Sequence, residues 1–326
     1  MMQNLAPLAL FVYNRPQHTR MTLESLKENY LADQTHLYIF ADGHKQATNT
    51  EEILKIREVR EIIRAEAWCG IVDIFEFADN QGLAQNIVQG INYVLGFHDK
   101  IIVLEDDLLL SKGFLRYMNE ALDVYQEEER VMHISGYKFP VGSNSLKLFF
   151  FNVPSSWGWA TWKRAWKAYE SDPNTLYDAL KCHHKLRTFD LEGSRFFLNH
   201  LKANMTLQIN TWAIKWYAVI CLKEGFCLYP GTSLVQNIGF DQSGTHCSSS
   251  QVYTVDQLAE SIPVEKIPLK EHTVFRKKMK LFYRYEGILL KHQLRYYHNL
   301  MKAFLYKFIP LGLKNIYKRL KYKFSN

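Results

Sequence analysis

Residues 8 to 135 alternate between short apolar segments and longer amphipathic segments, and this alternation restricts the fold most strongly. The short segments have the composition of buried strands, and the longer ones repeat apolar residues every three or four positions, as helices do. We expect strands at 8–13, 37–41, 71–77, 101–104 and 131–135, and helices at 16–26, 53–63, 81–97 and 113–128. Repeated strand–helix–strand units predict an α/β fold, a mostly parallel sheet with helices on both faces.

Length and composition describe an ordinary globular protein. A chain of 326 residues with 47% hydrophobic residues can bury one large core or two modest ones. The five cysteines are an odd number and form no CxxC pair, which favours reduced thiols and argues against zinc. No run of 18 apolar residues and no N-terminal targeting pattern is present, so we expect a cytoplasmic location.

Polar residues follow four of the expected strands. Arg15 follows the first, Asp42 the second and Asn80 the third, and the fourth runs into the acidic triplet 105–107. The carboxyl ends of parallel strands share one edge of the sheet, where ligands bind in open α/β folds. A carboxylate cluster at this edge predicts a divalent cation that carries phosphate oxygens. The alternative is a strand that runs into a solvated acidic turn, because surface turns also collect Asp and Asn.

Residues 136–265 are less regular and rich in tryptophan. Trp162, Trp166 and Tyr169 have helical spacing and are expected in the core. Trp157 and Trp159 flank a glycine beside a Ser/Pro turn, so either could contact a ligand or pack in the interior. The Gly-, Ser- and Asn-rich stretch 231–250 is expected to be a long loop that closes over the site as a lid.

The last part of the chain, 266–326, is predicted to form a basic tail of amphipathic helices. From Lys270 onward there are fifteen basic and two acidic residues, a net charge of +13, so the rest of the chain carries −6. Such helices bind anionic membrane surfaces, although the tail could instead pack on the acidic body. The long apolar face of the tail argues against nucleic acid as a partner.

Four motifs and a tryptophan segment resemble the GT-A class of nucleotide-sugar glycosyltransferases, especially bacterial family-2-like and N-acetylglucosaminyltransferase I-like enzymes. The resemblance covers about residues 5–250 and implies a GT-A domain over 1–265, with a nucleotide-binding half at 1–135 and an acceptor half at 136–265. The matching segments are Phe11-Val12-Tyr13-Asn14-Arg15-Pro16, Ala41-Asp42-Gly43, Asn80-Gln81-Gly82-Leu83-Ala84, Val103-Leu104-Glu105-Asp106-Asp107 and Trp157-Gly158-Trp159.

For the donor side, this resemblance implies a nucleotide-diphosphate sugar as substrate and Mn²⁺ or Mg²⁺ as cofactor. Asp107 would bind the metal, and His246 in the lid would help to hold the metal or the diphosphate. The other donor contacts would be Arg15 with the nucleotide, Asp42 with the base, Asn80 and Gly82 with the ribose or diphosphate, and Glu105 and Asp106 with the sugar and ribose.

For the acceptor side, Trp157 and Trp159 would contact the acceptor. Related inverting enzymes carry an acidic residue directly after a tryptophan in this region, but Trp212 is followed here by Ala213. Either another carboxylate, Asp241 or Glu105, would then act as the catalytic base, or the base lies at a different place in the sequence, or the stereochemistry of transfer differs.

Together these features predict a metal-dependent glycosyltransferase of bacterial surface polysaccharide synthesis, peripheral at the inner face of the plasma membrane. Its acceptor would be a glycan or a lipid-linked glycan. Two alternatives remain open. A sugar nucleotidyltransferase also places a metal-binding Asp on such a sheet, but usually has a glycine-rich loop after the first strand. A non-catalytic nucleotide-sugar or glycan-binding protein is the other alternative, and Ala213 keeps it in consideration.

Overall fold

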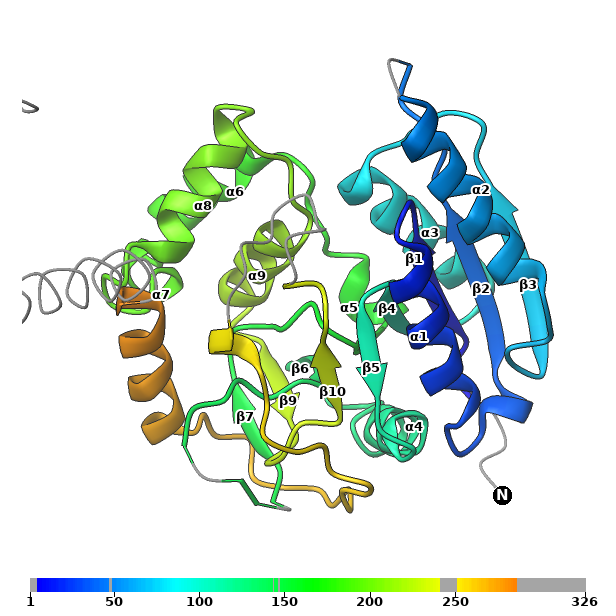
Figure 1. Ribbon diagram of the computed structural model, residues 1–326. Coiled ribbons are helices and arrows are strands. Elements are labelled where there is room, and N and C mark those ends of the chain that lie inside the picture. The colour runs from blue at the N-terminus through cyan, green and yellow to red at the C-terminus, as the bar shows by residue number, and fades with distance from the viewer. Residues whose placement is uncertain (1–4, 47–48, 143, 146, 241–250, 286–326) are drawn as a thin grey trace, which may run out of the picture.

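The computed structural model describes residues 5–46, 49–142, 144–145, 147–240 and 251–285. Its centre is an eight-stranded sheet in the order β3-β2-β1-β4-β8-β6-β9-β7 (Figure 1). The strands are β1 (Leu8–Val12), β2 (His36–Ala41), β3 (Ile71–Glu76), β4 (Lys100–Glu105), β6 (Val131–Ser135), β7 (Phe149–Phe151), β8 (Trp159–Trp162) and β9 (Phe226–Tyr229). Four of the seven neighbouring pairs are parallel, and the antiparallel ones involve β7 and β8. The predicted α/β fold with a mostly parallel sheet is confirmed.

Helices cover both faces of the nucleotide-binding half predicted from the sequence. α1 (Pro16–Lys27) and α2 (Thr50–Arg64) lie on one face, and α3 (Leu83–Phe97) lies on the other (Figure 1). The switch of face follows from right-handed crossovers, because the chain moves outward from β1 to β3 and then returns to β4. The point of reversal lies between β1 and β4, where ligands bind in such sheets.

The acceptor half predicted for 136–265 contains a helical group and several very short strands. Its helices are α5 (Lys163–Trp166), α6 (Pro173–Cys182), α7 (Leu186–Phe189), α8 (Phe196–Met205) and α9 (Ala213–Leu222). Helix α4 (Phe114–Val124) lies earlier in the chain, before β6. A separate antiparallel pair joins β5 (Leu108–Leu110) to β10 (Val235–Asn237). Strands β5, β7, β8 and β10 were not predicted, because three or four residues are too few to establish a period.

The first part of the predicted tail packs on the sheet domain. Glu271 forms a bridge with Phe150 of β7, and residues 273–285 are helical with Phe275, Met279 and Tyr283 buried. This C-terminal helix lies beside α7 and β7 (Figure 1). Residues 286–326 lie outside the described residues, so their amphipathic helices and membrane binding stay predictions. Within the described part of the chain, no helix has the length and apolar character needed to cross a bilayer.

Candidate active site

The ends of β1 and β4 bring Arg15 and the acidic triplet together. Phe11 of β1 is in register with Glu105 of β4, so the residues after both strands face the same sheet edge. Arg15 Nη1 lies 2.7 Å from Asp107 Oδ2 and 4.0 Å from Asp106 Oδ1. The strand end is therefore an ion-pair cluster with side chains mostly removed from water, and not a solvated acidic turn.

A backbone scaffold from distant segments fixes this turn. The Thr22 hydroxyl donates to the Asp106 carbonyl oxygen at 2.9 Å and accepts from Leu108 N–H at 3.1 Å, which ties the turn to α1. From the other side, Ile238 N–H donates to the Asp107 carbonyl oxygen at 2.9 Å. The turn is therefore held between α1 and the segment after β10.

Two residues of that segment lie directly against the Asp107 carboxylate. Asn237 Nδ2 is 3.4 Å from Asp107 Oδ1, and a Cβ atom added to Gly239 would lie 2.1 Å from Asp107 Oδ2. Sequence reasoning missed both, because 130 residues separate Asn237 from Asp107 and only the β5–β10 pairing joins them. The glycine content of 231–250 was the one available indication that the chain approaches another group closely there.

The acidic triplet is buried, and its negative charges exceed the positive charge that Arg15 supplies. Burial raises the pKa of Glu105 to about 8, and the charges of Asp107 and Asp106 add to this shift. Burial also raises the pKa of Asp106 and of Asp107, which the guanidinium of Arg15 partly counters. His18 of α1 also lowers the pKa of Asp107. The cluster would therefore be stabilised by another cation.

This charge balance predicts a pH dependence of stability for the protein without metal. Folding raises the pKa of Glu105 from 4.5 to about 8, so between these values the folded chain binds more protons than the unfolded chain. The free energy of unfolding should then fall as pH rises from 5 to 8, and Glu105→Gln should reduce that fall by on the order of 1 kcal/mol. Urea unfolding in EDTA measures it, with the exposed Glu58→Gln as the control. An unchanged pH slope in Glu105→Gln would contradict the assignment.

Asp42 organises a second group at the end of β2, the strand next to β1. Its buried carboxylate accepts four N–H groups: those of Gly43 at 2.9 Å, Gln81 at 2.8 Å and Gly82 at 3.1 Å, and Asn80 Nδ2 at 2.9 Å. Gly82 precedes α3 with φ of 79°, a conformation that glycine adopts without strain. Asp42 thus places a negative charge at the start of α3 and shapes the 80–82 loop. A base contact would have to replace one of these donors, and it stays a prediction.

The structure corrects the prediction for Trp159. Its side chain is fully buried and lies between His133, at 5.1 Å, and Trp212, at 5.0 Å, in nearly parallel stacks. It therefore belongs to the core and does not face an acceptor. Burial lowers the pKa of His133 to about 3, so this histidine is neutral within the stack. The tryptophan spacing could not reveal this, because the partners come from β6 and from the residue before α9.

Trp157 differs from Trp159 and stays a candidate for acceptor contact. It is half-buried and packs edge-on against Tyr137, Phe240 and Tyr253, with ring centroids 4.6, 5.4 and 5.1 Å away. Asp241 and His246, the predicted base and metal helper, lie outside the described residues.

The donor set fits a divalent ion that arrives with a substrate and does not fit a metal cage. Within the described ranges, no three His, Cys, Asp or Glu side chains are arranged to hold a metal ion. Mg²⁺ and Mn²⁺ are, however, often held by one or two carboxylates together with substrate phosphates. Asp107 is suited to this use, because it combines a deeply set carboxylate with an excess of negative charge around it.

Comparison with known proteins gives structural likenesses only. No protein-family model and no curated protein matches the sequence. A Pyrobaculum calidifontis mannosyltransferase, PcManGT, in complex with GDP-Man and Mn²⁺ is 13% identical, with a TM-score of 0.39 over 67% of this chain and 75% of the other. Residues 1–349 of S. aureus TarS are 11% identical, with a TM-score of 0.35 over 70% of this chain and 59% of TarS 1–349.

A UDP-glucose pyrophosphorylase complexed with UDP-glucose is also 11% identical, with a TM-score of 0.33 over 69% of this chain and 90% of the other. At these identities and TM-scores, the comparisons do not identify the reaction or the substrate of this chain.

Proposed function

We propose that this protein is a metal-dependent glycosyltransferase that moves a sugar from a nucleotide-diphosphate donor to a glycan or lipid-linked acceptor in bacterial surface polysaccharide synthesis. The observation that carries the proposal is the Arg15–Asp107 pair at 2.7 Å, at the carboxyl ends of β1 and β4. In this pair, the guanidinium could bind phosphate oxygens and the carboxylate could bind a divalent cation. The ordered 80–82 loop, one strand away, supplies a place for the nucleoside.

The residues of this site would act mainly on charge. Departure of a nucleoside diphosphate develops negative charge, which Arg15 is placed to stabilise. A divalent ion held by Asp107 and the diphosphate would supply Lewis-acid stabilisation of the same leaving group. As the bond from the sugar to the diphosphate breaks, the acceptor oxygen bonds to the sugar and gives up its proton. Glu105 and Asp241 are the two candidate bases that would take that proton.

A nucleotide panel tests the proposal. Unfolding temperatures should rise with one of UDP, GDP, CDP, ADP or TDP in the presence of Mn²⁺, and rise less in EDTA. Incubation with the matching nucleotide sugar should then release nucleoside diphosphate. Formation of nucleotide sugar from nucleoside triphosphate and sugar 1-phosphate would favour a nucleotidyltransferase instead. Affinity without any turnover would favour a binding protein.

Gly239 offers a test that removes no charged group. An alanine Cβ would lie 2.1 Å from Asp107 Oδ2 and 3.0 Å from Arg15 Nη1, so the ends of both side chains must move. We expect Gly239→Ala to weaken metal-dependent nucleotide binding at least about tenfold with little loss of stability. Gly96→Ala is the matched control, since nothing lies within 4 Å of its added Cβ. Calorimetric titration measures both, and equal affinities in the two variants would contradict this placement.

The basic C-terminal segment is proposed to bind anionic membranes. Attraction is worth roughly 1 kcal/mol per Lys or Arg near the lipid surface, and the segment 287–326 has nine of them. Deletion of 287–326 should abolish co-sedimentation with vesicles that contain phosphatidylglycerol. Neutral phosphatidylcholine vesicles, which should bind neither form, are the control. Full binding by the shortened protein would contradict the proposal.

A further inference from the structure

A cavity with both polar and apolar lining lies on the predicted acceptor side of the sheet, away from the acidic triplet. It has a volume of about 180 Å³ and lies where β6 and β9 end, where β7 begins and where the helix 273–285 starts. Lys138, Gly142, Ser145, Gly231, His272 and Lys278 are among the residues that line it. Neither Asp107 nor the Asp42 group contributes to this cavity, which is large enough for several waters or a small polyatomic anion.

Two lysines, Lys138 and Lys278, line the cavity, and no carboxylate of the described residues does. Lys138 is only 5% exposed, and its Nζ lies 3.3 Å from the neutral amide oxygen of Asn144. Among the described residues, no carboxylate lies within 4.0 Å of either Lys138 Nζ or Lys278 Nζ. Burial lowers the pKa of Lys138, and the nearby charge of Lys278 lowers it further. Lys138 is buried, whereas Lys278 is exposed. A buried ammonium that lacks a counterion is costly, so an anion held between the two side chains would stabilise Lys138.

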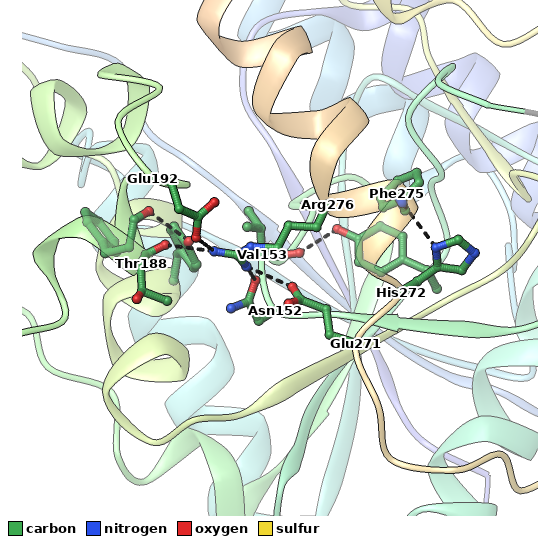
Figure 2. Close-up of polar contacts among 11 residues, drawn as sticks. Asn152, Val153, Thr188, Glu192, Glu271, His272, Phe275 and Arg276 are labelled. Carbon is green, nitrogen blue, oxygen red and sulfur yellow. Dashed lines mark hydrogen bonds and ion pairs between the residues drawn. The ribbon is translucent and has the colours of Figure 1, made fainter.

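The carboxylate that adjoins the cavity in the chain pairs with another residue. Glu271, next to His272, accepts from Arg276 Nη1 at 2.9 Å, and Arg276 also contacts Asn152 at 2.9 Å and Glu192 at 2.5 Å (Figure 2). This network anchors the helix to the body and pairs Glu271 with Arg276.

The anchored helix adds to the positive potential of the cavity. His272 precedes the helix and accepts Phe275 N–H on Nδ1 at 3.1 Å, as Figure 2 shows. The positive end of the helix dipole therefore lies beside the cavity, with the two lysines.

We propose that this cavity binds a phosphoryl group carried by the acceptor. This rests on the proposed glycosyltransferase function, because only a transferase has an acceptor on this side of the site. Strands β4 and β6 point in the same direction, so the cavity and Asp107 share one edge of the sheet. Trp157, the acceptor candidate, packs against Tyr137 and Phe139, the two neighbours of Lys138 in the chain. A phosphoryl group between the lysines would thus place the rest of the acceptor near Trp157.

Calorimetric titration of the full chain with inorganic phosphate and with glucose 6-phosphate, at constant ionic strength, tests this inference. We expect both to bind, and to compete with each other. Lys138→Met and Lys278→Met should each weaken binding at least about tenfold, the usual effect of losing a charge-assisted hydrogen bond. Lys277→Met, which alters an exposed lysine that does not line the cavity, should leave binding unchanged. In phosphate-free buffer, Lys138→Met should unfold at the same or a higher temperature, because it removes a buried charge without a counterion.

Several results would overturn the inference. Equal phosphate effects on all three lysine variants would show a general ionic effect, and binding of phosphate without glucose 6-phosphate would exclude a sugar-borne group. Competition by the nucleotide would assign the cavity to the donor. If phosphate and glucose 6-phosphate bind as expected while no nucleotide binds or turns over, the proposed function fails and the anion site stands.

Discussion

Asp107→Ala is expected to remove metal-dependent stabilisation by nucleoside diphosphates and to lower sugar transfer by about 10²- to 10³-fold or more. The reason is that Asp107 is the one carboxylate of the triplet in close contact with Arg15, at 2.7 Å, and it lies under Asn237 and Gly239. Without it the diphosphate would lose its cation and the alignment of Arg15. At a ligand concentration of 100 times Kd, the lost stabilisation would be about 2.7 kcal/mol.

The companion variants separate charge from shape. Asp107→Asn keeps the size of the side chain but removes its charge, so it should also lose the Mn²⁺ dependence. Glu58→Ala removes an exposed carboxylate of α2 and should change neither property. Thermal unfolding with nucleotide in Mn²⁺ or EDTA measures the first effect, and release of nucleoside diphosphate measures the second. Metal-dependent stabilisation that persists in Asp107→Ala would show that the metal assignment is wrong.

Asp42→Ala should destabilise the protein by about 2–4 kcal/mol. The carboxylate is 4% exposed and accepts four N–H groups, so its removal leaves buried donors without an acceptor at the start of α3. Asp42→Asn should also destabilise, because its amide would face N–H donors with an N–H₂ group. Urea unfolding measures both changes.

The control for Asp42 is Asp79→Asn, a nearby exposed carboxylate that should change stability by less than about 0.5 kcal/mol. Hydrogen exchange provides an independent measurement, since the amides of Gln81 and Gly82 should lose protection in Asp42→Ala. A variant as stable as Asp79→Asn, with these amides still protected, would contradict the role that we assign to Asp42.

The sequence anticipated the strands with clear patterns and missed the shortest ones. β1, β2 and β4 are apolar segments of five or six residues beside strongly periodic helices, and they were predicted almost to the residue. β5 and β10 are three residues each, and their pairing depends on a contact between residues about 125 positions apart. Long-range pairing of this kind leaves no local pattern, so the scaffold behind Asp107 could not be read from the sequence.

The same distinction separates the two tryptophans. The sequence gives Trp157 and Trp159 equal support as acceptor contacts, but the fold gives these two positions different neighbours. Trp159 lies in a strand at the centre of the sheet and is covered by Trp212 and Trp166, whereas Trp157 lies before the strand and remains half-buried.

By itself, the amino-acid sequence determined the α/β class, the polar strand ends and the basic character of the C-terminal segment, because periodicity and composition are local properties. Only the tertiary structure decided which polar groups meet. It placed Arg15 on Asp107, gave Asp42 four donors, closed Gly239 against the acidic turn and brought Lys138 and Lys278 to one cavity. Ion pairing and burial depend on distances between segments far apart in the chain, and those distances exist only after the sheet has assembled.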